Sequence, residues 1–284
     1  MFGRARTPSS SLHACDRAFR LTVPPRNRHH VLMREEARPT TLEWKGRTGP
    51  FTVSLGDGVF HPTHTSRAIA DSLEIGPEDT VIDVGCGSGV LSFVAARLGA
   101  RRVIGTDLSE HAIDVARQNA RTLGLSGSVE FRSGNLLDPV SGEKADVIIG
   151  DVSGIPDEIG RLAGWFPDGR AGGPTGAELP AAMLESIHEN DCLAPGGRLY
   201  LPTGTIQAES KILEVARRIF GAANLQSLTS KEFPLPDVVA KSKALAQMMK
   251  DGIVDLRARG SRLLWRLQVW RCELPKDGRI TALL

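Results

Sequence analysis

The sequence predicts a doubly wound α/β domain built around a mostly parallel sheet. From residue 80 onward, short apolar runs alternate with stretches whose apolar residues recur with helical spacing. One of those runs, at 145–151, is almost continuously apolar, as in a parallel strand that is covered on both faces. Alternation of this kind requires right-handed crossovers between neighbouring strands, which is why the sheet is expected to be largely parallel.

The N-terminal part of the chain differs in composition from the rest. Residues 1–40 are rich in Arg, Ser and Pro, and we expect a disordered basic extension there. For residues 1–32, a transit peptide and translation upstream of a start at Met33 are the alternatives. Residues 41–64 are expected to form an N-terminal flap, because two short strand-like segments in this stretch flank a turn containing Gly and Pro.

Residues 65–284 are expected to form the main domain. Its first helix begins at a cap provided by Thr65 or Ser66. Strands are expected, in order, at 80–85, 101–107, 128–135, 145–151, 197–203, 224–233 and 262–274. Helices are expected at 89–99, 109–124, 178–193 and 209–221, with an inserted helix near 237–257. A turn at 195–197, Pro-Gly-Gly, should separate the helix at 178–193 from the strand that follows it.

Composition excludes several classes of protein and leaves others open. A formal charge of +2 over 284 residues is too small to indicate a nucleic-acid partner. The four cysteines are far apart and form no C-x-x-C pair, so we expect neither disulfides nor a metal site. No apolar run approaches the roughly 20 residues that span a bilayer. We therefore expect a cytoplasmic monomer or homodimer with no membrane partner.

The strongest local signal is the segment 83–89, DVGCGSG, where the first strand turns into a helix. Glycines there let a ligand approach the backbone, and the helix N-terminus offers free N–H groups. The dinucleotide fingerprint places its third glycine three residues after the second, where this chain has Val90. An acid at Asp83 would also repel a pyrophosphate. Both observations argue against NAD and FAD.

S-adenosylmethionine has no phosphate and carries an α-ammonium and a sulfonium, so Asp83 would attract it. We therefore expect this cofactor at the glycine bend formed by Gly85, Cys86, Gly87 and Gly89. Asp107 ends the second strand, where a carboxylate can accept hydrogen bonds from the two ribose hydroxyls.

Asn135, after the third strand, could bind the adenine edge through its amide or be an ordinary turn residue. The remaining candidates for cofactor contacts are Leu108, Leu136 and Thr65.

Four motifs in order resemble those of the class I S-adenosylmethionine-dependent methyltransferases. They are DVGCGSG, GTDLS, SGNLLD and LAPGGRLYL, and the likeness covers about Val59 to Thr203. The resemblance implies a seven-stranded sheet in the order 3-2-1-4-5-7-6, with the seventh strand antiparallel. The segments GVFHPTHTSRAIADSL and GGPTGAELPAAMLESI look like the small-domain branch, which includes ribosomal-protein, release-factor glutamine and RNA N-methyltransferases.

The chain departs from that branch after the fourth strand. Several of those N-methylating enzymes carry N-P-P-Y there, whereas this chain has DVSG at 151–154. An anion at Asp151 suits a cationic amine or guanidinium acceptor, or a hydroxyl that needs a base. We expect Asp151 to be the catalytic residue, as an acceptor-orienting carboxylate or general base, with a local turn as the alternative.

Four further residues are candidates for binding the acceptor: Ser153, Trp165, Glu178 and His61. Each has a structural alternative, namely a turn for Ser153, an anchoring contact for Trp165, a helix cap for Glu178 and an exposed loop position for His61.

The predicted function is methyl transfer from S-adenosylmethionine to a nitrogen nucleophile, preferably an amine or guanidine of a small molecule or protein side chain. RNA or ribosomal-protein methylation and O-methylation are alternatives within the same chemistry. An NAD(P)-dependent oxidoreductase and a non-catalytic S-adenosylmethionine-binding module are alternatives outside it.

Overall fold

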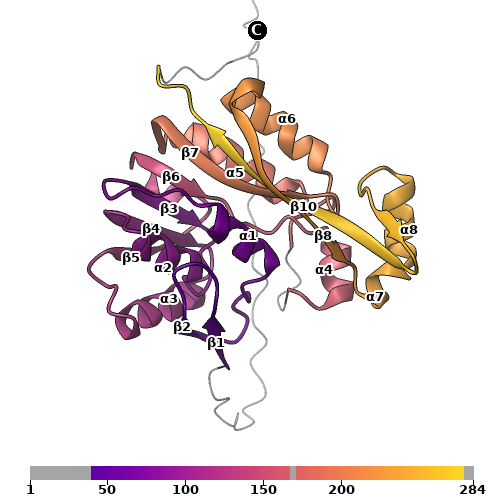
Figure 1. Cartoon of the computed structure of the whole chain (residues 1–284), viewed down its shortest axis with the longest axis horizontal. Helices are drawn as coiled ribbons and strands as arrows, with labels where there is room; N and C mark the ends of the chain where they lie inside the picture. The colour runs from indigo at the N-terminus through magenta and orange to yellow at the C-terminus, as the bar shows by residue number, and fades with distance from the viewer. Residues whose placement is uncertain (1–39, 167–170, 278–284) are drawn as a thin grey trace, which may run out of the picture. The chain divides into compact units, whose positions relative to one another are not determined.

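The computed structural model describes residues 40–166 and 171–277 (Figure 1). The extension expected at 1–40 therefore lies outside the described residues, except for Thr40. The strands of the main sheet are β3 (Thr80–Val84), β4 (Arg102–Asp107), β5 (Val129–Ser133), β6 (Ala145–Ile149), β7 (Leu193–Gly204), β8 (Leu225–Pro234), β9 (Arg257–Arg259) and β10 (Arg262–Glu273). The α-helices are α1 (His64–Ser72), α2 (Val90–Arg97), α3 (Glu110–Thr122), α4 (Asp157–Ala163), α5 (Glu178–Glu189), α6 (Glu209–Phe220), α7 (Asp237–Ala240) and α8 (Lys243–Lys250).

The sheet has the expected α/β topology. Its strand order is β5-β4-β3-β6-β7-β10-β8, which is the order 3-2-1-4-5-7-6 when these seven strands are numbered along the chain. The first five of them are parallel, and β10 runs antiparallel to both β7 and β8. The expected count of seven is wrong by one strand. The chain turns at Gly260 (φ +59°) between β9 and β10, and the short β9 pairs with β10 as an eighth strand.

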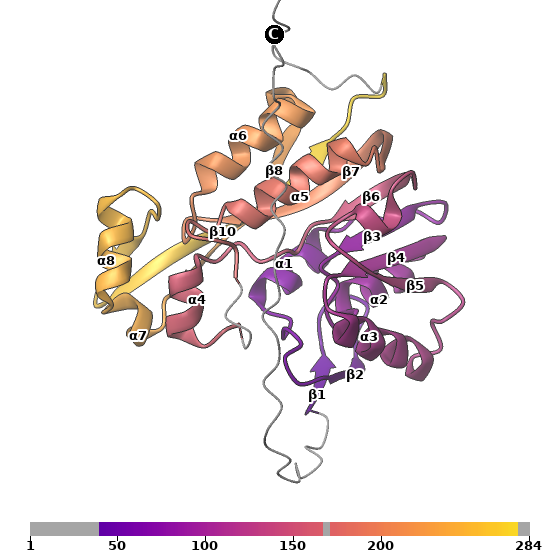
Figure 2. The same cartoon turned by 180° about the vertical axis from the view of Figure 1, so that it is seen from behind.

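Helices cover both faces of the sheet (Figures 1 and 2). On one face, α1, α2 and α3 bury apolar side chains against alternate strand residues such as Val81 and Val103. On the other face, α5 and α6 pack against the intervening residues, including Ile82 and Ile104. Both alternate sets are fully buried, as expected for parallel strands between two helical layers.

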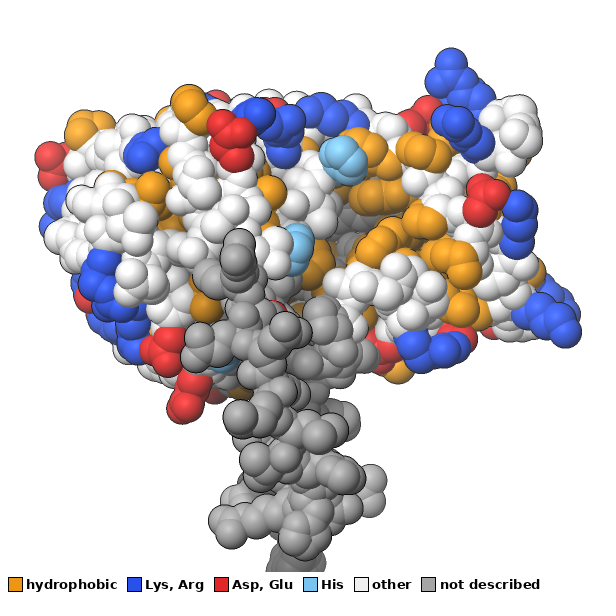
Figure 3. Space-filling view, turned by 90° about the horizontal axis from the view of Figure 1, so that it is seen from below, with side chains coloured by type: hydrophobic (Ala, Val, Ile, Leu, Met, Phe, Trp, Pro, Cys, Tyr) orange, Lys and Arg blue, Asp and Glu red, His pale blue; other side chains and the backbone are white. Residues whose placement is uncertain are grey.

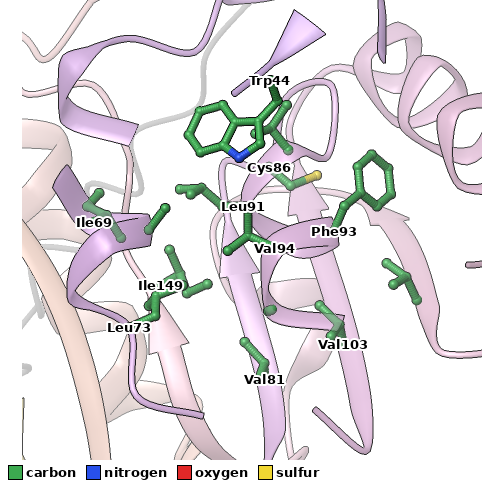
Figure 4. Packing of buried hydrophobic residues seen from close by; sticks show 14 of the residues in the cluster. Trp44, Ile69, Leu73, Val81, Cys86, Leu91, Phe93, Val94, Val103 and Ile149 are labelled. Atoms are coloured by element: carbon green, nitrogen blue, oxygen red, sulfur yellow. The ribbon is translucent and has the colours of Figure 1, made fainter. Parts of the chain in front are cut away.

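The N-terminal flap is a hairpin of β1 (Thr40–Trp44) and β2 (Phe51–Leu55) that forms its own two-stranded sheet. Its apolar side chains belong to the main core: Trp44 and Phe51 are both buried with the helices of the first face. In Figure 4, Trp44 lies on the same side of the sheet as Leu91 and Val94 of α2. The hairpin is thus packed as part of the domain.

Two boundaries differ from the sequence-based expectations. The cap of α1 is Thr63 and not Thr65 or Ser66, because Ser66 occupies the third helical position and its hydroxyl accepts a hydrogen bond from the Thr63 N–H. The Pro-Gly-Gly at 195–197 lies inside β7 and is no separate turn. It forms an irregularity in the pairing with β6, and it is held by hydrogen bonds between the Gly196 and Gly197 backbone and Leu274.

The segment between β8 and β10 is an insert that contains two short helices, α7 and α8, where one helix was expected over 237–257. The chain breaks at Ser242, whose side chain leaves the helical pattern and caps α8 by accepting the Leu245 N–H. The insert packs against α4, which lies within the long segment that follows β6 (Figures 1 and 2). Ile159 of α4 and Leu245 of α8 are fully buried there.

Candidate functional site

A pocket of about 340 Å³ lies at the carboxyl ends of β3, β4 and β6. Three acids line it, and each lies at or near the end of one of these adjacent strands: Asp83, Asp107 and Asp151. The glycine bend after β3 forms its floor, and the segment leading into α1 contributes Val59 and Phe60. Because the carboxyl ends of parallel strands meet at one edge of a sheet, the topology brings these three acids together.

Asp83 is the most deeply buried of the three acids, with 1% of its surface exposed. The Ser92 hydroxyl of α2 donates a 2.6 Å hydrogen bond to its Oδ2 atom. Burial raises the pKa of Asp83 to about 7, and the nearby charges of Asp151 and Asp107 act in the same direction. This carboxylate therefore lies in an environment that favours a positive ligand beside it.

Asp107 fixes the geometry of the glycine bend. Its Oδ2 atom accepts the N–H of Gly87 at 2.9 Å, and its Oδ1 atom accepts the N–H of Ser109 at 2.9 Å. Gly87 has a φ of +53°, which glycine adopts without strain. A carboxylate has about four acceptor sites, so two hydrogen bonds to the backbone leave Asp107 able to accept more from a ligand.

Asp151 is half-buried at the end of the fourth strand. The hydroxyl of Ser66 in α1 donates a 2.7 Å hydrogen bond to its Oδ2 atom. Burial raises the pKa of Asp151 to about 6, against the opposing effect of that hydrogen bond. Asp151 therefore changes its charge close to neutral pH while it faces the same pocket as Asp83.

Aromatic rings lie in the lining of the pocket and beside the start of α1. Phe60 and Phe166 both line the pocket and stack with their centroids 5.3 Å apart. His64 at the start of α1 stacks on Phe233 of β8, whose ring in turn packs against Trp265. From below, the surface is hollowed and hydrophobic side chains gather beside the hollow (Figure 3).

The structure brings together seven of the eleven residues expected to bind the cofactor or to catalyse. Lining the pocket are Asp83, Gly85, Cys86, Gly87, Asp107, Leu108 and Asp151.

The other four expected cofactor contacts do not line it. Gly89 caps α2 with a φ of +89°, and Thr65 lies in the first turn of α1. Asn135 is exposed, and its side-chain amide donates a 3.4 Å hydrogen bond to Asp138 Oδ2. Leu136 packs against the second face of the sheet, and its carbonyl accepts the Thr106 hydroxyl.

The residues expected to bind the acceptor are dispersed. Trp165 packs against the cluster of α4 and the insert, while its neighbour Phe166 lines the pocket. Glu178 is the first residue of α5 and accepts the Thr175 N–H and hydroxyl, but it does not cap the helix, whose N-cap is Ala177. His61 is exposed between two pocket-lining residues. The Ser153 hydroxyl is buried, and no described residue partners it.

Sequence reasoning assigned no functional role to Ser66 or Phe166. Ser66 lies three residues after Thr63, which marks a capping box, but the sequence does not reveal that its hydroxyl meets Asp151 85 residues away. Phe166 is adjacent to Trp165 in the sequence, and only the structure shows that Phe166 lines the pocket while Trp165 packs elsewhere.

Two features are absent from residues 40–166 and 171–277. No helix in that part of the chain is long and apolar enough to cross a membrane. Its His, Cys, Asp and Glu side chains form no group of three or more that could hold a metal ion.

Part of the chain matches a known family model. Residues 53–154 match the family model described as ribosomal protein L11 methyltransferase (PrmA). A protein of that name from Alkaliphilus metalliredigens is 38% identical over 128 residues, which cover 43% of this chain and 40% of the relative. Its namesake from Listeria innocua is 29% identical over 171 residues, covering 60% of this chain and 45% of the relative. The chain thus spans less than half the length of these curated relatives.

Solved structures with a similar arrangement are more distant. The ribosomal protein L11 methylase from Lactobacillus delbrueckii subsp. bulgaricus has 20% identity and a TM-score of 0.42, over 71% of this chain and 74% of that one. The M. jannaschii tRNA m1G37 methyltransferase has 12% identity and a TM-score of 0.49, over 81% and 56% of the respective chains. The sequence matches confirm that this chain resembles the class I S-adenosylmethionine-dependent methyltransferases, through the segment that carries the glycine bend and all three pocket acids.

Proposed function

We propose that this protein is a cytoplasmic S-adenosylmethionine-dependent methyltransferase that methylates a side-chain nitrogen of another protein. The observation that carries the proposal is the single pocket in which Asp83 and Asp107 flank the glycine bend while Asp151 faces them from the next strand. This arrangement offers a site for a cationic nucleoside beside a site for a nitrogen acceptor.

The pocket residues fit S-adenosylmethionine. Asp83 is buried with Ser92 as its hydrogen-bond partner, so an α-ammonium beside it would supply the missing positive charge. Asp107 retains acceptor capacity for the ribose hydroxyls. Leu108 lines the pocket with 54% of its surface exposed, and an adenine ring would cover this apolar side chain.

The backbone of Gly85, Cys86 and Gly87 would approach the amino-acid end of the cofactor. We retain Gly89, Asn135, Leu136 and Thr65 as more peripheral candidates, since these residues do not line the pocket.

When bound, the cofactor supplies an electrophilic methyl carbon attached to a positively charged sulfur. The acceptor nitrogen must offer a lone pair, so a protonated amine has to lose a proton before the new N–C bond would form and the S–C bond would break, with S-adenosylhomocysteine as the leaving group. Asp151 is placed to attract the cationic amine, to orient it through an N–H donor and to receive its proton. The pKa of about 6 suits that task, because the carboxylate is charged at neutral pH and binds a proton more readily than an ordinary Asp.

The choice of acceptor rests on Asp151 and on the relatives. Asp151 stands where the N-P-P-Y enzymes have a neutral amide, and a carboxylate favours an amine or guanidinium over an amide or a base edge. The relatives' name states that they act on ribosomal protein L11. We therefore propose an amine of a protein side chain as the acceptor. Ribosomal protein L11 is the first protein to test, and Ser153, Trp165, Glu178 and His61 are secondary candidates for its contacts.

The test has two parts. Calorimetry should detect S-adenosylmethionine binding, and NADH should give no heat. Transfer of tritiated methyl groups should then be measured to L11, to lysine- and arginine-containing peptides, and to transfer RNA. Label on a protein nitrogen supports the proposal. Label on RNA alone would overturn the acceptor, and cofactor binding without transfer to any fraction of a cell extract would indicate a non-catalytic module.

A further inference from the structure

The contact between Ser66 and Asp151 joins the start of α1 to the acceptor side of the pocket. Ser66 is 4% exposed, and its Oγ atom has two partners. The Thr63 N–H donates to it at 3.2 Å, and Asp151 Oδ2 lies 2.7 Å away. A backbone N–H can only donate, so this bond uses a lone pair of the hydroxyl and leaves its single hydrogen free to point at Asp151.

This direction has a chemical consequence. A hydroxyl that donates to Oδ2 stabilises the charged carboxylate and keeps the proton off that oxygen. The remaining oxygen, Oδ1, is then the one available to the acceptor and to its proton. The Ser66 hydroxyl thus opposes the effect of burial on the ionisation of Asp151, and it occupies one of the two carboxylate oxygens.

The position of Ser66 is itself fixed from both sides of the α1 N-terminus. Phe60, just before the helix, stacks on Phe166 from the segment after β6. His64, in the first turn, stacks on Phe233 of β8 with centroids 4.8 Å apart. These contacts hold the first turn of α1 against the strand ends, so the hydroxyl reaches Asp151 without a rearrangement of the helix.

Other charged groups near Asp151 also influence its ionisation. Asp83 faces it from β3 and has a raised pKa to which the charge of Asp151 contributes. Asp107 lines the same pocket from β4. Both are acids, so they oppose a second negative charge and leave the Ser66 hydroxyl as the group that favours the carboxylate.

We propose that Ser66 is a positioning residue for methyl transfer, which holds Asp151 ionised and directs its Oδ1 atom to a cationic amine acceptor. This inference rests on the proposed function for its kinetic consequence, but the interaction itself can be tested without any turnover. The expected sign follows from the geometry: loss of the donated hydrogen bond makes the carboxylate less stable and its protonated form more populated.

The direct experiment is a pH titration of the protein with ¹³C-labelled Asp carboxyl groups, followed by NMR, with the Asp151 signal assigned by its absence in Asp151→Asn. Ser66→Ala should raise the pKa of Asp151 by about 1. The hydrogen bond stabilises the charged carboxylate over its protonated form, and the loss of a bond of this kind corresponds to a change of about one pKa unit. Ser66→Thr, which keeps the hydroxyl, should leave it close to the wild-type value. An unchanged titration in Ser66→Ala would overturn the proposal.

A matched control separates this effect from helix capping. Thr63→Ala removes the other half of the same cap, the hydrogen bond from the Thr65 N–H to the Thr63 hydroxyl, and leaves Ser66 in place. It should lower stability through the loss of that cap bond, without moving the Asp151 titration. A similar shift in both variants would show that loosening of α1 is the cause and would refute the role of the hydroxyl.

Kinetics with ribosomal protein L11 as the methyl acceptor supply the second readout. In Ser66→Ala the acidic limb of the kcat/KM profile should move to higher pH by the same amount as the Asp151 titration, and Ser66→Thr should restore it. Adding Ser66→Ala to Asp151→Asn should change the profile no further. A separate shift in the double variant would contradict action through Asp151. If L11 accepts no methyl group, the proposed acceptor fails, while the NMR titration still decides the role of Ser66.

Discussion

The Oδ2 atom of Asp107 accepts a 2.9 Å hydrogen bond from the backbone N–H of Gly87, so the end of β4 holds the bend that follows β3. Its other oxygen accepts the N–H of Ser109, which caps α3. One carboxylate therefore organises two turns at the pocket edge before any ligand binds. The same group is the one proposed to hold the ribose, so its loss should affect binding in two ways.

Asp107→Ala is expected to weaken S-adenosylmethionine binding by roughly 100-fold or more, because each hydrogen bond to a charged group is worth about 1.5 to 3 kcal/mol. Isothermal calorimetry measures the change directly. Asp114→Ala is the matched control, since Asp114 lies on the exposed face of α3 and pairs with Arg117 at the surface. Equal affinities for Asp107→Ala and Asp114→Ala would contradict the assigned role of Asp107.

Asp83 should make the free protein less stable as the pH rises. Its pKa is about 7 in the folded state and 3.8 in the reference state, so between these values the folded protein holds a proton that the unfolded chain has lost. The stability contributed by this proton is complete below about pH 4. It decreases as the pH rises and is lost once the pH has passed about 7. The ligand-free Asp83→Asn variant should therefore exceed the wild type in unfolding free energy at pH 8, by up to about 4 kcal/mol, and by less at pH 5. Urea denaturation at the two pH values tests this.

The same substitution should separate stability from binding. Asp83→Asn removes the charge proposed to attract the α-ammonium, so S-adenosylmethionine should raise its melting temperature less than that of the wild type. Asp71→Asn, at a surface position, serves as the control and should behave as the wild type in both measurements. A variant that gains no stability at pH 8 would show that burial of Asp83 is not costly in the free protein.

The packing around Gly105, which lies beside Cys86 of the glycine bend, gives a prediction about stability. A Cβ atom at Gly105 of β4 would lie 2.6 Å from the Phe131 ring and 3.0 Å from Cys86 Sγ, both of which are buried. Gly105→Ala should therefore lower the unfolding free energy by roughly 1 to 3 kcal/mol through overpacking. At Gly127 a Cβ would meet nothing within 4 Å, so Gly127→Ala should have little effect. Chemical denaturation of the two variants distinguishes a local clash from a general effect of removing glycine.

The sequence predicts the sheet well because its strands are encoded locally. An apolar run between turn residues identifies β6 without knowledge of its neighbours, and the Gly that follows α3 has the positive φ expected of a helix end. The Asp83 and Asp107 positions follow from the same local pattern, since strand ends in a parallel sheet share an edge.

The parts of the fold and of the site that the sequence does not predict depend on contacts between distant segments. The Ser66 hydroxyl reaches Asp151 only when α1 packs beside the segment that follows β6, and the division of the insert at Ser242 reflects a cap that competes with a continuous helix. For the same reason Trp165 and Phe166, adjacent in sequence, face different clusters. Apolar residues in a long segment carry no periodic signal that would tell which of them faces the pocket.

The N-terminal hairpin was expected to be a flap, and its packing predicts that it is needed for stability. Phe51 is 6% exposed and makes an edge contact with the Phe93 ring of α2, with centroids 6.3 Å apart. Arg97 of the same helix lies over its ring at 4.8 Å. Phe51→Ala should therefore cost roughly 3 to 5 kcal/mol of unfolding free energy, as truncation of a buried aromatic does. Thr52→Ala, at the next and exposed position of β2, should leave stability nearly unchanged. If both variants unfold at the same urea concentration as the wild type, the hairpin is a detachable flap and its buried surface contributes little to the domain.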